Sequence, residues 1–160
     1  MSANVDCPTF FGYRLDLDMA KPSACVGLDS SSQLVYLGFL AKDTDTMALA
    51  DFYSPKTIAI DAPLSLPLGL CCLEEGCSCK QESPRKNRQC DQELRRQGIP
   101  CYPTTRRTFI KALTYRGIEL KTSIGSGPKQ TSQLIEVDPF ASKVRLLGAK
   151  LCRRRVPNKA

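Results

Sequence analysis

Two segments of this chain share one pattern: an apolar strand, an acidic residue and then a proline. They are TIAIDAP at residues 57–63 and QLIEVDP at residues 133–139. A strand made almost wholly of apolar residues is typical of a sheet covered on both faces, and proline ends further pairing because it has no amide hydrogen. The chain is therefore expected to contain such strands, each with a carboxylate at its carboxyl end.

A three-stranded meander is predicted before the first of these strands. Apolar and polar residues alternate over residues 11–19, which is the period of a strand. Short apolar segments at residues 24–28 and 34–40 follow, each after a turn candidate, AKPS or DSSSQ. These three segments are expected to pair as antiparallel hairpins.

Four helices are predicted from apolar spacing and from their end signals. They are expected at residues 42–55, 84–98, 104–126 and 140–148. Asp43 or Thr44 is expected to cap the first helix, Pro84 to lie near the first turn of the second, and Gly98 to end it. The third helix is expected to be imperfect around Gly117.

The predicted order, β-β-β-α-β-α-α-β-α, indicates an α/β fold with a mixed sheet and helices on both faces. At 160 residues the chain is expected to form one domain. We place that domain at residues 9–152, with a cysteine-rich insertion at about 68–84. A short tail is expected at residues 1–8 and a basic tail at 153–160.

Charge and composition limit the chemistry. The formal net charge is +7, which favours an anionic partner such as nucleic acid, although a solvated basic surface explains it equally well. The chain contains no histidine, which excludes Ser-His-Asp and Cys-His catalysis and zinc sites that need imidazole. No apolar run approaches the roughly 20 residues of a membrane span, and no signal peptide is evident, so we expect a cytoplasmic protein without a membrane partner.

Acidic residues lie at the carboxyl ends of three of the expected strands. They are Asp16 and Asp18, Asp61, and Glu136 and Asp138. If these strands are parallel neighbours, their carboxylates meet at one sheet edge, where Mg²⁺ or Mn²⁺ would relieve the repulsion and activate water. The alternatives are a turn cap for Asp61, a wet strand face for the first two, and an ion pair with arginine for Glu136.

Five blocks of the sequence, spanning about residues 9–150, resemble a known family. They are FFGYRLDLDMAKPSA, IAIDAPLSLP, RQCDQELRRQGIPCYPTT, LTYRGIEL and LIEVDPFASK. In this order they are similar to the successive blocks of the predicted nucleases catalogued as domain of unknown function 429. The resemblance implies a ribonuclease H-like fold and a metal-dependent nuclease with an acidic site across the first, fourth and fifth strands.

The resemblance also assigns roles to single acids. It implies that Asp18, in preference to Asp16, acts with Asp61 and Glu136 as a catalytic ligand of Mg²⁺ or Mn²⁺. Asp138 stands where the family more often has an aromatic residue, so it is either a further catalytic ligand or a neutral change. The closing helix lacks the acid usual in the ribonuclease H pattern, and the alternative is therefore a catalytically silent nucleic-acid-binding module of the same fold.

Five cysteines lie close together in the segment CCLEEGCSCKQESPRKNRQC. They are Cys71, Cys72, Cys77, Cys79 and Cys90. In a cytosolic chain such a group favours metal over disulfides, and four of the five would complete a structural Zn²⁺ site. An iron–sulfur cluster and uncoordinated thiols are the alternatives.

Basic residues accompany the second and third helices. Arginine binds phosphate through its planar fork, so Arg88, Arg95 and Arg106 are candidate substrate-binding residues. Asp91 is included because it shares the block RQCDQELRRQG with Arg88. The alternative for most of these residues is a solvated helix face.

Overall fold

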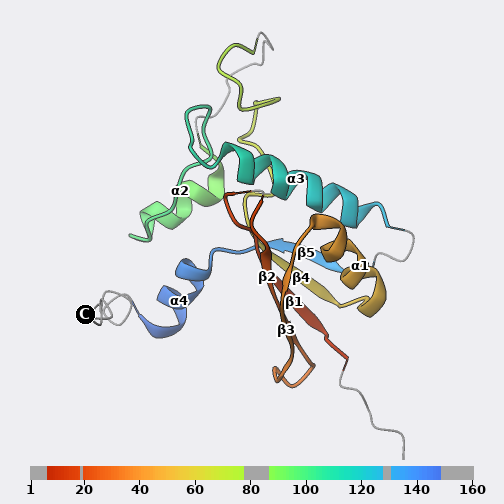
Figure 1. Cartoon of the computed structure of the whole chain (residues 1–160). Coiled ribbons are helices and arrows are strands. Elements are labelled where there is room, and N and C mark those ends of the chain that lie inside the picture. The colour runs from red at the N-terminus through yellow and green to blue at the C-terminus, as the bar shows by residue number, and fades with distance from the viewer. Residues whose placement is uncertain (1–6, 19, 78–86, 128–130, 149–160) are drawn as a thin grey trace, which may run out of the picture.

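The computed structural model describes residues 7–18, 20–77, 87–127 and 131–148, and within them the secondary structure follows the predicted order (Figure 1). The elements are β1 Phe10–Arg14, β2 Ser23–Leu28, β3 Leu34–Leu40, α1 Asp43–Tyr53, β4 Thr57–Asp61, α2 Gln89–Arg96, α3 Lys111–Gly125, β5 Gln133–Glu136 and α4 Pro139–Leu147. Most of the two predicted tails lies outside the described residues.

The five strands form one mixed sheet in the order β3-β2-β1-β4-β5. The pairs β1–β2 and β2–β3 are antiparallel, which confirms the predicted meander. The pairs β1–β4 and β4–β5 are parallel, with Phe10 opposite Thr57 and Thr57 opposite Gln133. Because β1, β4 and β5 run in the same direction, their carboxyl ends lie at one edge of the sheet.

The core lies on the face of the sheet that α1 and α3 cover. Phe11 and Ile58 from the central strands are buried there against Ala50 of α1 and Leu120 of α3. The helix α4 lies on the other side of the sheet from α1 (Figure 1). The cover on that side is partial, because Leu37 and Phe39 of β3 are 73% and 77% exposed, so the expectation of a sheet covered on both faces is met only in part. No helix in the described ranges combines the length and the apolar character that a membrane crossing requires.

The helix α3 is continuous through Gly117, so the predicted imperfection there is wrong. A Cβ atom at this position would lie 2.6 Å from the carbonyl oxygen of Pro63 and 3.0 Å from Cβ of Ala62. Glycine is therefore present because α3 passes directly over the segment after β4, where the helix has no room for a side chain.

Arg116 joins four parts of the fold. The residue is 4% exposed, and its guanidinium donates to both carboxylate oxygens of Asp43, to Oγ of Ser23 and to the carbonyl oxygen of Asp16. The predicted cap of α1 is therefore wrong, because Asp43 is inside the helix and Lys42 is the N-cap. The Lys42 amide donates to the carboxylate of Asp45 instead.

The strand β1 ends at Arg14, earlier than the alternating pattern predicted. After it, Oδ1 of Asp16 accepts the amide of Asp18, and Oδ1 of Asp18 accepts the amide of Ala20. Such aspartate-to-backbone bonds compete with strand pairing, and periodicity alone does not reveal them. Met19, the predicted end of the strand, lies outside the described residues.

The second and third helices also begin later than predicted. The helix α2 begins at Gln89 with Arg88 as its N-cap, and Pro84 lies outside the described residues. Before α3, the amide of Thr108 donates to the carbonyl oxygen of Thr105 in a turn. That turn takes the place of the first helical residues that the sequence suggested.

Candidate functional site

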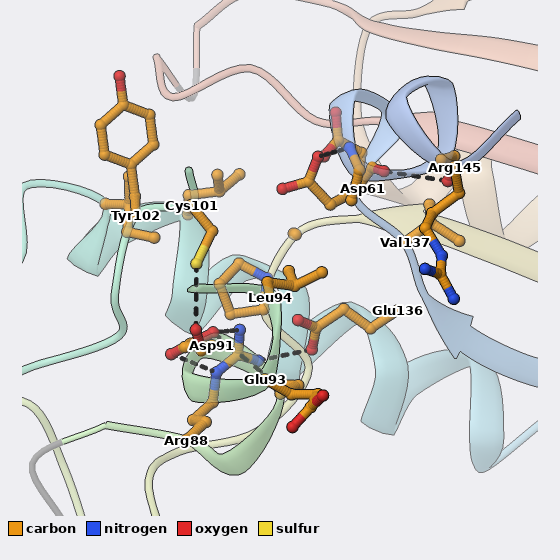
Figure 2. Close-up of a pocket in the computed structure, with 18 of the residues that line it drawn as sticks. Asp61, Arg88, Asp91, Glu93, Leu94, Cys101, Tyr102, Glu136, Val137 and Arg145 are labelled. Atoms are coloured by element: carbon orange, nitrogen blue, oxygen red, sulfur yellow. Dashed lines mark hydrogen bonds and ion pairs between the residues drawn. The ribbon is translucent and has the colours of Figure 1, made fainter. Parts of the chain in front are cut away.

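A cavity of about 790 Å³ opens at the carboxyl ends of β4 and β5, next to α2 and α4 (Figure 2). Its charged lining comes from several elements. These residues are Asp61, Arg88, Asp91, Glu93, Glu136, Asp138 and Arg145. In open α/β sheets ligands bind outside the carboxyl ends of the parallel strands, and this cavity has that position.

Arg88 lies between two carboxylates in this cavity. Its Nη2 is 2.7 Å from Oδ1 of Asp91 and its Nη1 is 2.6 Å from Oε2 of Glu136. Burial lowers the pKa of Arg88, but the hydrogen bonds to Asp91 and Glu136 outweigh this and hold the pKa above its ordinary value. The side chain is 7% exposed and stays charged, so it pairs with both acids, offsets part of their negative charge and attaches α2 to β5.

Backbone amides complete this cluster. The Leu64 amide donates to Oε2 of Glu136 at 2.8 Å, and the Thr104 amide donates to Oδ2 of Asp91 at 3.1 Å. The segment after β4 and the loop before α3 are thereby fixed around Arg88. These hydrogen bonds hold the wall of the cavity in place.

Asp61 has weaker charge compensation. Its nearest cation is Arg14, whose Nε is 3.9 Å from Oδ2 and whose side chain is 80% exposed. Burial raises the pKa of Asp61 above its ordinary value, Arg14 lowers it, and the negative charge of Asp138 raises it further. Asp61 and Asp138 are therefore two mutually repelling carboxylates at neighbouring strand ends.

Asp138 is the N-cap of α4, and its Oδ1 accepts the amide of Ala141 at 2.9 Å. Within the described residues no donor reaches its other carboxylate oxygen. Capping orients this side chain and leaves one oxygen for a ligand.

The predicted acids are not brought together as one group. The β4–β5 register pairs Glu136 with Ile60, so Glu136 shares the face of Ile60, whereas Asp61 follows Ile60 and projects to the opposite face. Figure 2 shows Glu136 directed at Arg88, with Asp61 set apart from both. Asp16 and Asp18, which bond within their own turn, do not line the cavity.

The structure separates the predicted basic residues and their partner Asp91 into two kinds. Arg88 and Asp91 face inward and bind each other, whereas Arg95 is exposed on α2 and Arg106 is half-buried in the loop before α3.

Sequence reasoning missed Tyr102 and Arg145 at the cavity. The tyrosine lies in the block IPCYP and the arginine on the closing helix, but neither position carries a pattern that marks a site.

Three of the five predicted zinc ligands come together. The sulfur atoms of Cys71, Cys72 and Cys77 all lie within 4.8 Å of one another. Cys79 lies outside the described residues. Cys90 instead lines the acidic cavity, where its sulfur is 3.7 Å from Oδ1 of Asp91. These three cysteines could hold a metal ion such as Zn²⁺, and they are the only such group of three or more among the described Cys, Asp and Glu side chains.

Comparison of the chain with protein-family models, with curated proteins and with solved structures gives no match. The family named from the sequence blocks therefore stays a prediction. The structure itself establishes an α/β fold with a mixed five-stranded sheet.

Proposed function

We propose that the chain is a metal-dependent nuclease in which Asp61 and Asp138 hold a Mg²⁺ or Mn²⁺ ion. The observation that carries this proposal is the pair of carboxylates at the ends of β4 and β5. They repel each other, and the cation paired with Asp61 is the exposed Arg14, 3.9 Å away. A divalent ion would relieve that repulsion, and hard cations prefer carboxylate oxygens.

Two further features support a nucleic-acid substrate. The strand order 3-2-1-4-5, with β2 antiparallel, is the arrangement expected of the ribonuclease H-like fold that the sequence blocks suggested. The net charge of +7 favours a polyanion.

Within such a site each of these residues would have a separate role. Asp61 and Asp138 would orient the ion, which when bound polarises a phosphoryl oxygen and makes coordinated water more acidic. Arg145 would contact phosphate, and Tyr102 would offer its ring to a base. Arg88 would act as a positioning residue, because it holds Glu136 and the wall formed by α2.

A second candidate is a nucleic-acid-binding module of the same fold without catalysis. The observation that favours it is the engagement of the other acids. Oε2 of Glu136 is bound by Arg88, and Asp16 and Asp18 lie outside the cavity. A pair of metal ions about 4 Å apart needs more than two carboxylates to hold it.

Calorimetric titration with Mn²⁺ tests the proposal. Asp61→Asn and Asp138→Asn should each weaken Mn²⁺ binding at least about tenfold, because each removes a charge while asparagine keeps the shape and the capping ability. Asp51→Asn, at an exposed position of α1, is the matched control and should bind as the wild type does.

Cleavage of labelled single- and double-stranded DNA and RNA is measured with the same proteins. The nuclease is supported if cleavage needs Mn²⁺ and is lost in both cavity variants. Retention of nucleic acid without cleavage identifies the binding module instead. Absence of both Mn²⁺ binding and nucleic-acid binding overturns both candidates.

A further inference from the structure

The loop after β4 brings three sulfur atoms together away from the acidic cavity. Sγ of Cys71 is 3.3 Å from Sγ of Cys77, and the sulfur of Cys72 lies within 4.8 Å of both. In a tetrahedral zinc site with Zn–S bonds of about 2.3 Å, neighbouring sulfurs lie about 3.8 Å apart. Once Cys71 is reduced, the observed spacing needs only small side-chain rotations to accept an ion.

The fold fixes the backbone of this loop. Leu73 is fully buried, and its amide donates to the hydroxyl of Tyr115 on α3 at 2.7 Å. That hydroxyl donates to Oε1 of Glu74, and Nζ of Lys111 is 3.2 Å from Oε2 of the same carboxylate. The amide of Cys77 then donates to the carbonyl oxygen of Glu74 at 3.3 Å. Packing against α3 thus sets the positions from which the three cysteines project.

The ligand chemistry selects the metal. The three cysteine side chains offer sulfur, a soft donor, and no described carboxylate joins them within 4.8 Å, which disfavours Mg²⁺ or Ca²⁺. Thiolate donors suit Zn²⁺, the borderline-soft ion of closed structural sites. Each thiol gives up its proton when it coordinates the ion.

We propose that Cys71, Cys72 and Cys77 supply three of the four ligands of one Zn²⁺ ion that cross-links residues 71–77 of this loop. The site is separate from the acidic cavity and has a structural role. Cys71 is disulfide-bonded in the structure, so the metal-binding form arises after thiol–disulfide exchange, in which a small-molecule dithiol reduces this disulfide and is itself oxidised to a disulfide. Cys90, which contacts Asp91 in the cavity, is not a ligand.

The test measures zinc in the full chain, purified without chelator, fully reduced and then desalted. Elemental analysis should return about one Zn²⁺ per chain. Co²⁺ in place of zinc should give the intense ligand-to-metal absorption of thiolate coordination. Cys72→Ser and, separately, Cys77→Ser should weaken zinc binding at least about 100-fold in competition with a chromophoric chelator, because serine is a poor ligand for this ion.

Two cysteine variants serve as matched controls. Cys7→Ser changes an exposed thiol near β1, and Cys90→Ser changes the thiol of the acidic cavity. Both should keep full zinc occupancy and the thiolate absorption. Thermal melts of all variants in the presence of chelator should agree within a few degrees, which separates loss of the ligand from loss of the fold.

Reduced protein that binds no zinc, or Cys72→Ser and Cys77→Ser variants with wild-type affinity, would overturn the proposal. Loss of zinc in Cys90→Ser would also overturn it, because the ligand set would then differ. These outcomes do not depend on the nuclease test, since that test follows Mn²⁺ at Asp61 and Asp138.

Discussion

Arg88 and Asp61 line the same cavity in opposite electrostatic conditions. Arg88 has two carboxylates within hydrogen-bond distance, and its charge is fully compensated. Asp61 has a like charge nearby, and its one paired cation among the described residues is the exposed Arg14 at 3.9 Å. Substitutions at Arg88 are therefore expected to act through stability, whereas substitutions at Asp61 should act through ligand binding.

The metal-free protein should gain stability when Asp61 is replaced by asparagine. Because burial raises the pKa of Asp61 in the folded chain, the native state holds this proton more tightly than the unfolded state. The contribution of Asp61 to the stability of the wild type therefore becomes less favourable as the pH rises above the ordinary value of 3.8. Asp61→Asn removes that loss. The variant should therefore have a higher unfolding free energy than the wild type at pH 7, and the difference should shrink toward zero in acid.

Urea unfolding in the presence of chelator, measured from pH 3 to pH 7, checks this expectation. Asp51→Asn, on the exposed surface of α1, should show no such trend. An Asp61→Asn variant that is less stable than the wild type at pH 7 would mean that the attraction to Arg14 outweighs burial.

At the scale of elements, the molecule depends on how closely α3 approaches the segment after β4. Glycine at position 117 permits this contact, and the same segment positions Leu64, whose amide holds Glu136. The packing of α3 and the geometry of the cavity wall are therefore connected through a few backbone atoms.

Gly117→Ala should lower the unfolding free energy by about 1–3 kcal/mol, the usual cost of overpacking, even though alanine favours helix. The new Cβ would meet the backbone of Pro63, which has little freedom to move. Gly125→Ala, at the end of the same helix with nothing within 4 Å, is the matched control and should be neutral or stabilising. Denaturant melts of the two variants measure the difference, and equal stabilities would contradict the close approach.

The order of the elements could be predicted because it depends on local patterns such as apolar spacing, glycine and proline. The end of β1 and the start of α3 could not, since a bond from Asp16 to the amide of Asp18 ends strand pairing, and a turn from Thr105 to Thr108 precedes the helix. The candidate site was predicted only in part. Asp61 and Glu136 do lie at neighbouring strand ends, but which face each occupies depends on the β4–β5 register, which no local pattern reveals.

At the scale of the whole molecule, Arg116 connects α3 to α1, to β2 and to the turn after β1. Arg116→Ala should lower the unfolding free energy by about 3 kcal/mol, because it leaves the carboxylate of Asp43 without its partner and Ser23 without its donor. Arg116→Lys keeps the positive charge but loses the planar guanidinium group and its several donors. It should therefore recover only part of the lost unfolding free energy. Urea denaturation checks both, and an alanine variant as stable as the wild type would show that the connection is dispensable.

The position of β1 in the centre of the sheet has a consequence for synthesis on the ribosome. One edge of β1 pairs with β2, which follows it closely, but the other edge pairs with β4, where Phe10 meets Thr57. The edge of β4 in turn stays open until Gln133 has emerged. The nascent chain therefore presents two unpaired strand edges in succession, and each is a template on which a neighbouring nascent chain can pair wrongly.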